Sequence, residues 1–142
     1  MFEQFEVRTP SHACLIDITS QVDGVVSRSG VREGICHVVA PHTTAGLTVN
    51  ENADPTVRSD ILAELDKIVP WEDGYEHAEG NSAAHIKSSL LGQSVYLLIS
   101  GGRLRLGTWQ GLFFAEFDGP RTRKVWVQVI ADTQGSCPGL PV

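Results

Sequence analysis

The residues after Gly92 constrain the fold most, because short apolar segments alternate there with glycine-containing turns. Val95 to Ile99 and Lys124 to Ile130 each predict a strand, since both are rich in β-branched and other apolar residues. Leu104 to Phe117 between them is strand-like with two glycine breaks. Turns this short join antiparallel neighbours, because a parallel connection needs a dozen or more residues.

The first half of the chain adds strands and the clearest helix. Alternating or continuous apolar residues predict strands over residues 2–7, 13–18, 35–40 and 46–50. Asp54 is a good N-cap and Pro55 suits the first helical position. Apolar residues then recur at helical spacing until Pro70 ends the helix.

Two shorter helices complete the predicted elements. Thr19 or Ser20 is expected to cap the first of them, with Asp23 in its first turn and Gly30 as its end. Asn81 or Ser82 opens the second, which ends at Gly92. Its apolar residues Ile86 and Leu90 lie one turn apart and are expected to face inward.

These elements predict one α+β domain with a mixed, mostly antiparallel sheet and about three helices packed on it. A length of 142 residues fits a single domain, which we place at residues 1–131. Residues 132–142 hold several glycines and prolines and are expected to form a flexible tail.

The composition restricts the expected cellular compartment and the expected classes of binding partner. A net charge of −6 argues against general nucleic-acid binding. No apolar run reaches membrane-spanning length, and charged residues within the first ten argue against a signal peptide. The three cysteines are odd in number and form no C-x-x-C pair, so no disulfide framework is indicated. We therefore expect a cytoplasmic protein without a membrane or nucleic-acid partner.

Three of the five histidines are candidate metal ligands. His77 lies in a polar loop, His85 lies on the helix that follows, and His42 follows a strand. Neutral imidazole is a preferred zinc ligand, and three protein ligands with an open fourth position form the catalytic pattern. The alternative is that each is an ordinary structural histidine, as we expect for His12 and His37.

Several polar residues are candidates for catalysis or substrate binding. Glu51 is the acidic residue of its turn that has no evident structural role, so it is a candidate base or fourth ligand. The planar guanidinium group of arginine binds phosphate well through paired N–H donors. Alternatively, these side chains form an ordinary solvent-exposed face of the protein. The candidate arginines are Arg103, Arg105, Arg121 and Arg123. Trp109 and Gln110 lie between glycines and suit either a flat heterocycle or an interface.

Taken together, these segments resemble the YjbQ family, the secondary thiamine-phosphate synthase enzymes. The resemblance runs from about residue 10 to about residue 131 and rests on several motifs in the same order. The motifs are His42-Thr43-Thr44-Ala45, Asn50 to Pro55, His77, Asn81 with Ala84 to Gly92, Leu106 to Gly111, and Gly119-Pro120-Arg121 with Arg123.

The resemblance implies a homotrimer that joins hydroxymethylpyrimidine diphosphate to thiazole phosphate and releases pyrophosphate. It implies a bound metal on His42, His77 and His85. We assign Glu51 and Asn81 as candidate catalytic residues beside it. The arginines would then hold the small phosphorylated substrate, and Trp109 would stack on a ring. Imidazole ligands suit a zinc-like ion, whereas diphosphate chemistry usually employs magnesium. Magnesium arriving with the substrate would use Glu51 or Asp54.

Two other functions are consistent with the same residues. A metal-dependent hydrolase would use the three histidines with Glu51 as base for a metal-activated water. A non-catalytic trimeric binding protein would use the metal as a staple between subunits. Either would keep the predicted fold.

Overall fold

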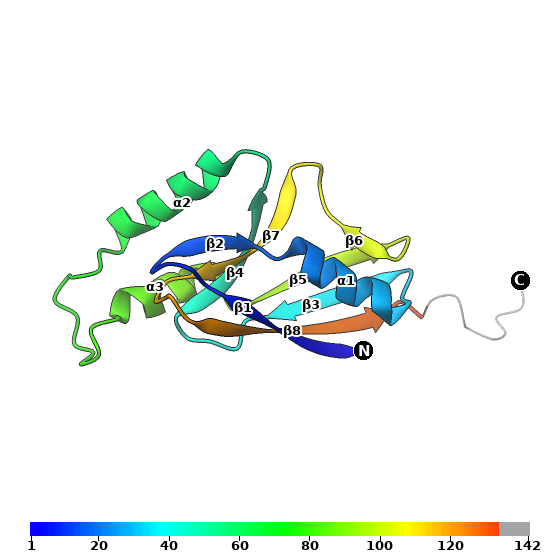
Figure 1. The fold of residues 1–142 in the computed structure, drawn as a ribbon, viewed down its shortest axis with the longest axis horizontal. Coiled ribbons are helices and arrows are strands. Elements are labelled where there is room, and N and C mark those ends of the chain that lie inside the picture. The colour runs from blue at the N-terminus through cyan, green and yellow to red at the C-terminus, as the bar shows by residue number, and fades with distance from the viewer. Residues whose placement is uncertain (134–142) are drawn as a thin grey trace, which may run out of the picture.

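Eight strands and three helices make up residues 1–133, the part of the chain that this computed structural model describes (Figure 1). The strands are β1 (Phe2–Arg8), β2 (Cys14–Asp17), β3 (Gly34–Val39), β4 (Ala45–Glu51), β5 (Ser94–Ser100), β6 (Arg103–Arg105), β7 (Gln110–Glu116) and β8 (Thr122–Ala131). The helices are α1 (Thr19–Ser29), α2 (Pro55–Ile68) and α3 (Ser82–Leu91).

The strands form two sheets in which every pairing within residues 1–133 is antiparallel. One sheet has the order β1-β8-β3-β5-β6, and the other has the order β2-β7-β4. The predicted α+β class with three helices and a mostly antiparallel sheet is therefore confirmed. The glycine-interrupted segment 104–117 contributes to both sheets, because β6 pairs with β5 whereas β7 pairs with β2 and β4.

Helix α1 packs on the main core between the two sheets. Its residues Val22, Val25 and Val26 are buried together with Val125 and Val127 of β8. The expected cap at Thr19 or Ser20 is wrong, because the helix already begins at Thr19. The Asp17 carboxylate accepts hydrogen bonds from both the backbone N–H and the hydroxyl of Thr19 instead.

Helix α2 begins as predicted but packs loosely. The Asp54 side chain accepts from the Thr56 N–H at 2.9 Å, and Pro55 occupies the first turn. No residue of this helix is fully buried within the chain, and Ile68 is 61% exposed. Figure 1 shows α2 running along the margin of the domain, and its residues Ile61, Leu62 and Leu65 are half-buried against a small core cluster that includes Phe113 and Phe117.

Helix α3 presents a different face to the core from the one expected. Ile86 and Leu90 are 38% and 58% exposed, so their predicted inward orientation is wrong. The buried residues are Ala83, Ala84, Lys87 and Ser88. The close approach of strand and helix explains the choice: a Cβ at Gly46 of β4 would lie 2.7 Å from the Gly92 carbonyl oxygen. Ala83, Ala84 and Ser88 fit that spacing because their side chains are small, whereas Lys87 extends toward α2 and donates from Nζ to Asp66 at 3.0 Å.

The outer face of the five-stranded sheet is unusually apolar. The apolar outer face consists of Phe2, Ile35, Tyr96, Leu98, Trp126 and Ile130, all exposed. The outward positions of β3 and β5 carry no acidic or basic residue except His37, which stacks on Tyr96 with ring centroids 4.1 Å apart. Exposed sheet faces are usually polar, so an apolar face of this kind is unusual for a monomeric protein.

No helix within residues 1–133 combines the length and the apolar character that a membrane span requires. Most of the predicted tail, including Cys137, lies outside the described residues.

Candidate functional site

One cavity of about 510 Å³ gathers the three candidate histidines and two of the candidate arginines. His42 lies in the loop between β3 and β4, His77 lies in the loop before α3, and His85 lies on α3. Arg121 and Arg123 follow the turn between β7 and β8. The cavity is also lined by Pro41, Thr43, Thr44, Glu79, Asn81 and Asp118. We refer to it as the histidine–arginine pocket.

His77 and His85 lie at a spacing that suits a shared ion. Their ring centroids are 5.4 Å apart and the rings meet nearly edge to face. Two imidazoles bound tetrahedrally to zinc at about 2 Å bring their ring centres to about 5 Å. The donor type also fits, because neutral imidazole prefers zinc and similar ions.

His42 is engaged differently. Its Nε2 accepts a hydrogen bond from the backbone N–H of Lys124 at 2.9 Å. Burial, and then the positive charge of Arg123, lower the pKa of His42, which favours the neutral ring. Within residues 1–133, no three His, Cys, Asp or Glu side chains lie close enough to hold an ion. The spacing of His77 and His85 is thus compatible with a shared ion, and the roles of all three histidines as ligands stay predictions.

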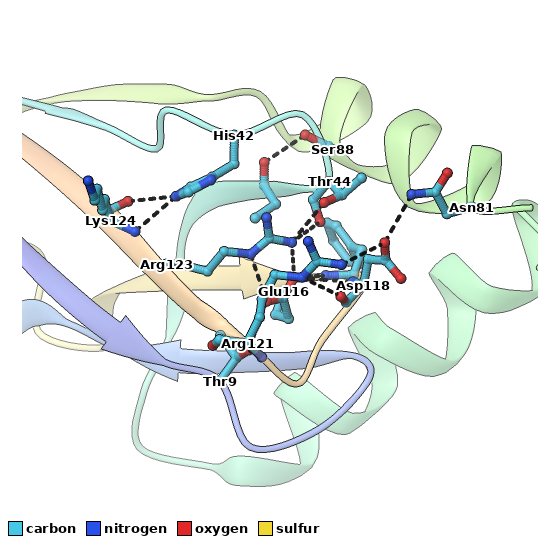
Figure 2. Close-up of polar contacts among 12 residues, drawn as sticks. Thr9, His42, Thr44, Asn81, Ser88, Glu116, Asp118, Arg121, Arg123 and Lys124 are labelled. Atoms are coloured by element: carbon cyan, nitrogen blue, oxygen red, sulfur yellow. Dashed lines mark hydrogen bonds and ion pairs between the residues drawn. The ribbon is translucent and has the colours of Figure 1, made fainter. Parts of the chain in front are cut away.

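A buried ion pair fixes Arg123 at the wall of the pocket (Figure 2). Arg123 donates from Nε to Glu116 Oε1 at 2.8 Å and from Nη2 to the other carboxylate oxygen. Nη2 also donates to Thr44 Oγ1 at 2.7 Å, and Thr9 donates its hydroxyl to Glu116. Glu116 is fully buried and Arg123 nearly so, which holds the guanidinium in one orientation.

A second ion pair positions Arg121 beside the first (Figure 2). Arg121 donates from Nε to the Asp118 carbonyl at 2.9 Å and from Nη2 to Asp118 Oδ2 at 3.1 Å. Asn81 Nδ2 donates to the same Oδ2 at 3.0 Å. The two arginines thus lie on the same pocket as the imidazoles, each paired with a carboxylate from the end of β7.

The structure places Glu51, Trp109 and Gln110 elsewhere. Glu51 pairs with Gln110 at one end of the β4–β7 ladder, while Ala45 pairs with Glu116 at the other end, next to the pocket. Six residues of strand separate the two ends by about 20 Å. Within one chain, Glu51 therefore does not lie beside the histidines, as the hydrolase alternative required.

The remaining arginines also lie outside this pocket. Arg103 of β6 donates from Nε to Asp23 Oδ2 of α1 at 2.7 Å, and Arg105 lines a separate cavity formed mainly by residues of β3, β5 and β8. Asp54 is used as the α2 cap. Substrate-binding roles for Arg103, Arg105, Trp109 and Gln110 stay predictions.

Sequence reasoning missed the carboxylates that hold the two pocket arginines. Glu116 and Asp118 are two residues apart, as are Arg121 and Arg123, and a turn separates the pairs. A hairpin would be the simplest prediction from this spacing, but β7 and β8 lie in different sheets and do not pair. The spacing of the acids and arginines was therefore only a weak signal for their contact.

Comparison with known proteins identifies relatives along nearly the whole chain. A family model described as UPF0047 protein YjbQ-like matches residues 3–132. A UPF0047 protein of Methanocaldococcus jannaschii is 48% identical over 132 residues, covering 93% of this chain and 96% of that protein. The UPF0047 protein YugU of Bacillus subtilis is 45% identical over 131 residues, covering 92% of this chain and 99% of that protein.

Solved structures share the fold. A YjbQ/UPF0047 family protein of Clostridium acetobutylicum superposes with a TM-score of 0.89 at 53% identity, covering 90% of this chain and 99% of that one. A protein of Sulfolobus solfataricus, described as YbjQ-like and of unknown function, gives a TM-score of 0.89 at 32% identity, covering 93% and 97%.

Proposed function

The chain belongs to the UPF0047 family of YjbQ-like proteins, and from that membership and the geometry of the pocket we propose a metal-dependent transferase acting on small phosphorylated substrates. One observation carries the proposal: two arginines, each oriented by a carboxylate, line the same cavity as three imidazoles. Guanidinium groups bind phosphate oxygens, and imidazoles bind transition ions. Their convergence suits phosphate chemistry better than a structural role.

The proposed reaction is thiamine-phosphate synthesis from hydroxymethylpyrimidine diphosphate and thiazole phosphate, as the family resemblance implies. Negative charge builds up on the departing pyrophosphate, and fixed N–H donors stabilise such charge because they need not reorganise during the reaction. Arg121 and Arg123 are those donors in this proposal. Asn81 lies in the same pocket and is the better placed of the two candidate catalytic residues, since Glu51 lies at the other end of β4.

We assign His77 and His85, together with His42, to a zinc-like ion, with magnesium entering on the substrate. Such an ion would supply positive charge to phosphate oxygens. For His42 to take part, it must use Nδ1 or release the Lys124 backbone, because its Nε2 is already bonded. In the structure, the three histidine side chains line a polar cavity next to the two guanidinium groups.

The activity is tested by mixing both substrates with the purified protein and either zinc or magnesium, and by measuring pyrophosphate release. We expect release from wild type and a loss of at least about 100-fold in Arg121→Ala, because a fixed charge stabilising a transition state contributes this much. Gln21→Ala, an exposed change on α1, serves as the control and should behave as wild type. Absence of release from wild type with every metal would contradict the proposed reaction.

We further propose that the protein is a cytoplasmic homotrimer, as the resemblance implies. The apolar outer face and the loosely packed helix α2 support association, because monomeric proteins rarely leave such surfaces open to water. A second copy of this chain is the occupant that the proposal names for the apolar outer face.

Leu98, which lies on β5 within the apolar outer face and is 63% exposed, offers the direct test. Leu98→Glu is expected to shift the molar mass measured by light scattering from three chains to one, because a buried unpaired charge is costly. Gln21→Glu introduces the same charge on α1 and should leave three chains. A wild-type monomer would contradict the trimer, and dissociation by chelator alone would support the metal-staple alternative.

A further inference from the structure

His77 and His85 line a second cavity in addition to the histidine–arginine pocket. This second cavity has a volume of about 530 Å³ and shares both imidazoles with the pocket. We refer to it as the tyrosine–isoleucine cavity. Its other lining residues are Gly74, Tyr75, Glu76, Ser82 and Ile86. The two cavities are therefore adjacent at the histidine pair.

The order of residues along the chain explains why the histidine pair contributes to both cavities. In the loop before α3, the three residues preceding His77 line the tyrosine–isoleucine cavity, whereas Glu79 after it lines the histidine–arginine pocket. On α3, a turn of about 100° per residue places Ile86 to one side of His85 and the N-cap Asn81 to the other. The loop and the helix thus each supply residues to both cavities, with a histidine at the boundary.

The two cavities differ in their charged groups. Arg121 and Arg123 bring two positive charges to the histidine–arginine pocket, whereas no lysine or arginine of residues 1–133 lines the tyrosine–isoleucine cavity. Its acidic residue, Glu76, would repel a second phosphate. The tyrosine–isoleucine cavity therefore suits the uncharged part of a phosphorylated molecule better than another anionic group.

Tyr75 and Ile86 supply the large apolar side chains of the tyrosine–isoleucine cavity. Tyr75 is half-buried, and its hydroxyl donates to the Pro70 carbonyl at 2.7 Å, which restrains the ring. Ile86 is 38% exposed, although the helical pattern predicts that it faces inward. Aromatic and branched aliphatic side chains are typical surfaces for packing against a flat heterocycle. Contact with such a ligand gives Ile86 a role that packing within the chain does not.

We infer that the tyrosine–isoleucine cavity binds the uncharged ring of a substrate whose phosphate groups bind Arg121 and Arg123, with Tyr75 and Ile86 as specificity-determining residues. The inference rests on the proposed function, because it takes the histidine–arginine pocket to be the phosphate site. Since the two cavities share the histidine pair, the ligand class is a flat heterocycle joined to a phosphate or diphosphate by a short linker. Hydroxymethylpyrimidine diphosphate, one of the two proposed substrates, belongs to this class.

Calorimetric titration with hydroxymethylpyrimidine diphosphate and with inorganic pyrophosphate, both with magnesium present, tests the inference. Both compounds carry two linked phosphates, and only the first carries a ring. We expect wild type to bind the first at least about tenfold more tightly, since burying roughly 60 Å² of apolar surface favours binding by that factor. Ile86→Ser and Tyr75→Ala should each reduce this preference at least about threefold, because each removes part of the apolar surface, and should leave pyrophosphate affinity unchanged.

Leu90→Ser is the matched control for Ile86→Ser. It removes a similar apolar side chain one turn further along α3, at an exposed position that lines neither cavity. This variant should keep the wild-type preference for the ring compound. Ile86→Leu should also keep it, because the side chain stays apolar and keeps its volume.

The outcomes distinguish failure of the inference from failure of the proposed function. If Arg121→Ala weakens both compounds while Ile86→Ser and Tyr75→Ala keep the wild-type preference, the phosphate site stands and the assignment of the ring is wrong. Equal binding of the two compounds by wild type, or equal weakening of both by Ile86→Ser, would also overturn that assignment. If wild type binds neither compound at millimolar concentration, the phosphate site fails together with the inference.

Discussion

Replacement of Glu116 by alanine is expected to lower the free energy of unfolding by about 3–5 kcal/mol, because it leaves the guanidinium of Arg123 buried without a counter-charge. Glu116 is fully enclosed and accepts from Arg123, from Thr9 and from the backbone N–H groups of two following residues. All of these donors lose their partner together. Urea unfolding followed by circular dichroism measures the change.

Glu3→Ala is the matched control, since Glu3 forms an exposed pair with Arg28 and its loss should change stability little. Equal stability of Glu116→Ala and wild type would contradict the account of the buried pair. A double change of Glu116 to leucine and Arg123 to methionine should recover part of the loss, because no lone charge then remains buried.

The same carboxylate makes the stability sensitive to acid. Burial alone would raise the pKa of Glu116, but the hydrogen bonds from Arg123 and Thr9 outweigh it and hold the pKa below its ordinary value. A group whose pKa is lower in the folded state stabilises it at higher pH, and this contribution is lost as the pH falls through the folded value. Below about pH 4.3, the ordinary value for glutamate, wild type should lose stability more steeply than Glu116→Gln.

Replacement of His85 by alanine is expected to weaken zinc binding by more than about 100-fold, since even the loss of an outer partner of a ligand costs 10–100-fold. His85 and His77 are the pair whose spacing fits a shared ion, so His77→Ala should have the same effect. Equilibrium dialysis followed by metal analysis measures the affinity. Pyrophosphate release should fall in parallel if the ion serves the reaction.

His12→Ala is the matched control for this prediction. His12 packs edge-on against Trp71, with ring centroids 4.4 Å apart, and does not line the histidine–arginine pocket. Its replacement should leave zinc affinity unchanged. If His85→Ala binds zinc as tightly as wild type, the histidines of the pocket are not the ligands.

The local signals in the sequence were sufficient for most of the fold. Asp54 and Pro55 predicted the start of α2, and Gly92 predicted the end of α3, because capping depends on a few adjacent residues. The inward face of α3 could not be predicted in this way. It is determined by how closely β4 approaches at Gly46, a contact between residues more than forty positions apart.

The candidate site, like the fold, could be predicted only in part from local sequence. The three histidines were identified by residue type, and the structure places them on one cavity with Arg121 and Arg123. Residue type gave no means of separating these arginines from Arg103, which instead pairs with Asp23. That separation depends on which carboxylate lies across the neighbouring strand or helix, and pairing of this kind is a property of tertiary structure.

The central claim is that the phosphate group of a substrate binds in the histidine–arginine pocket. A crystal soaked in tungstate, a phosphate analogue that scatters anomalously, tests it most directly. The account predicts an anomalous peak from a tungstate whose oxygens accept hydrogen bonds from both Arg121 and Arg123, next to His42 and Asn81. A peak beside Arg103 and Arg105 instead, with none in this pocket, would contradict it.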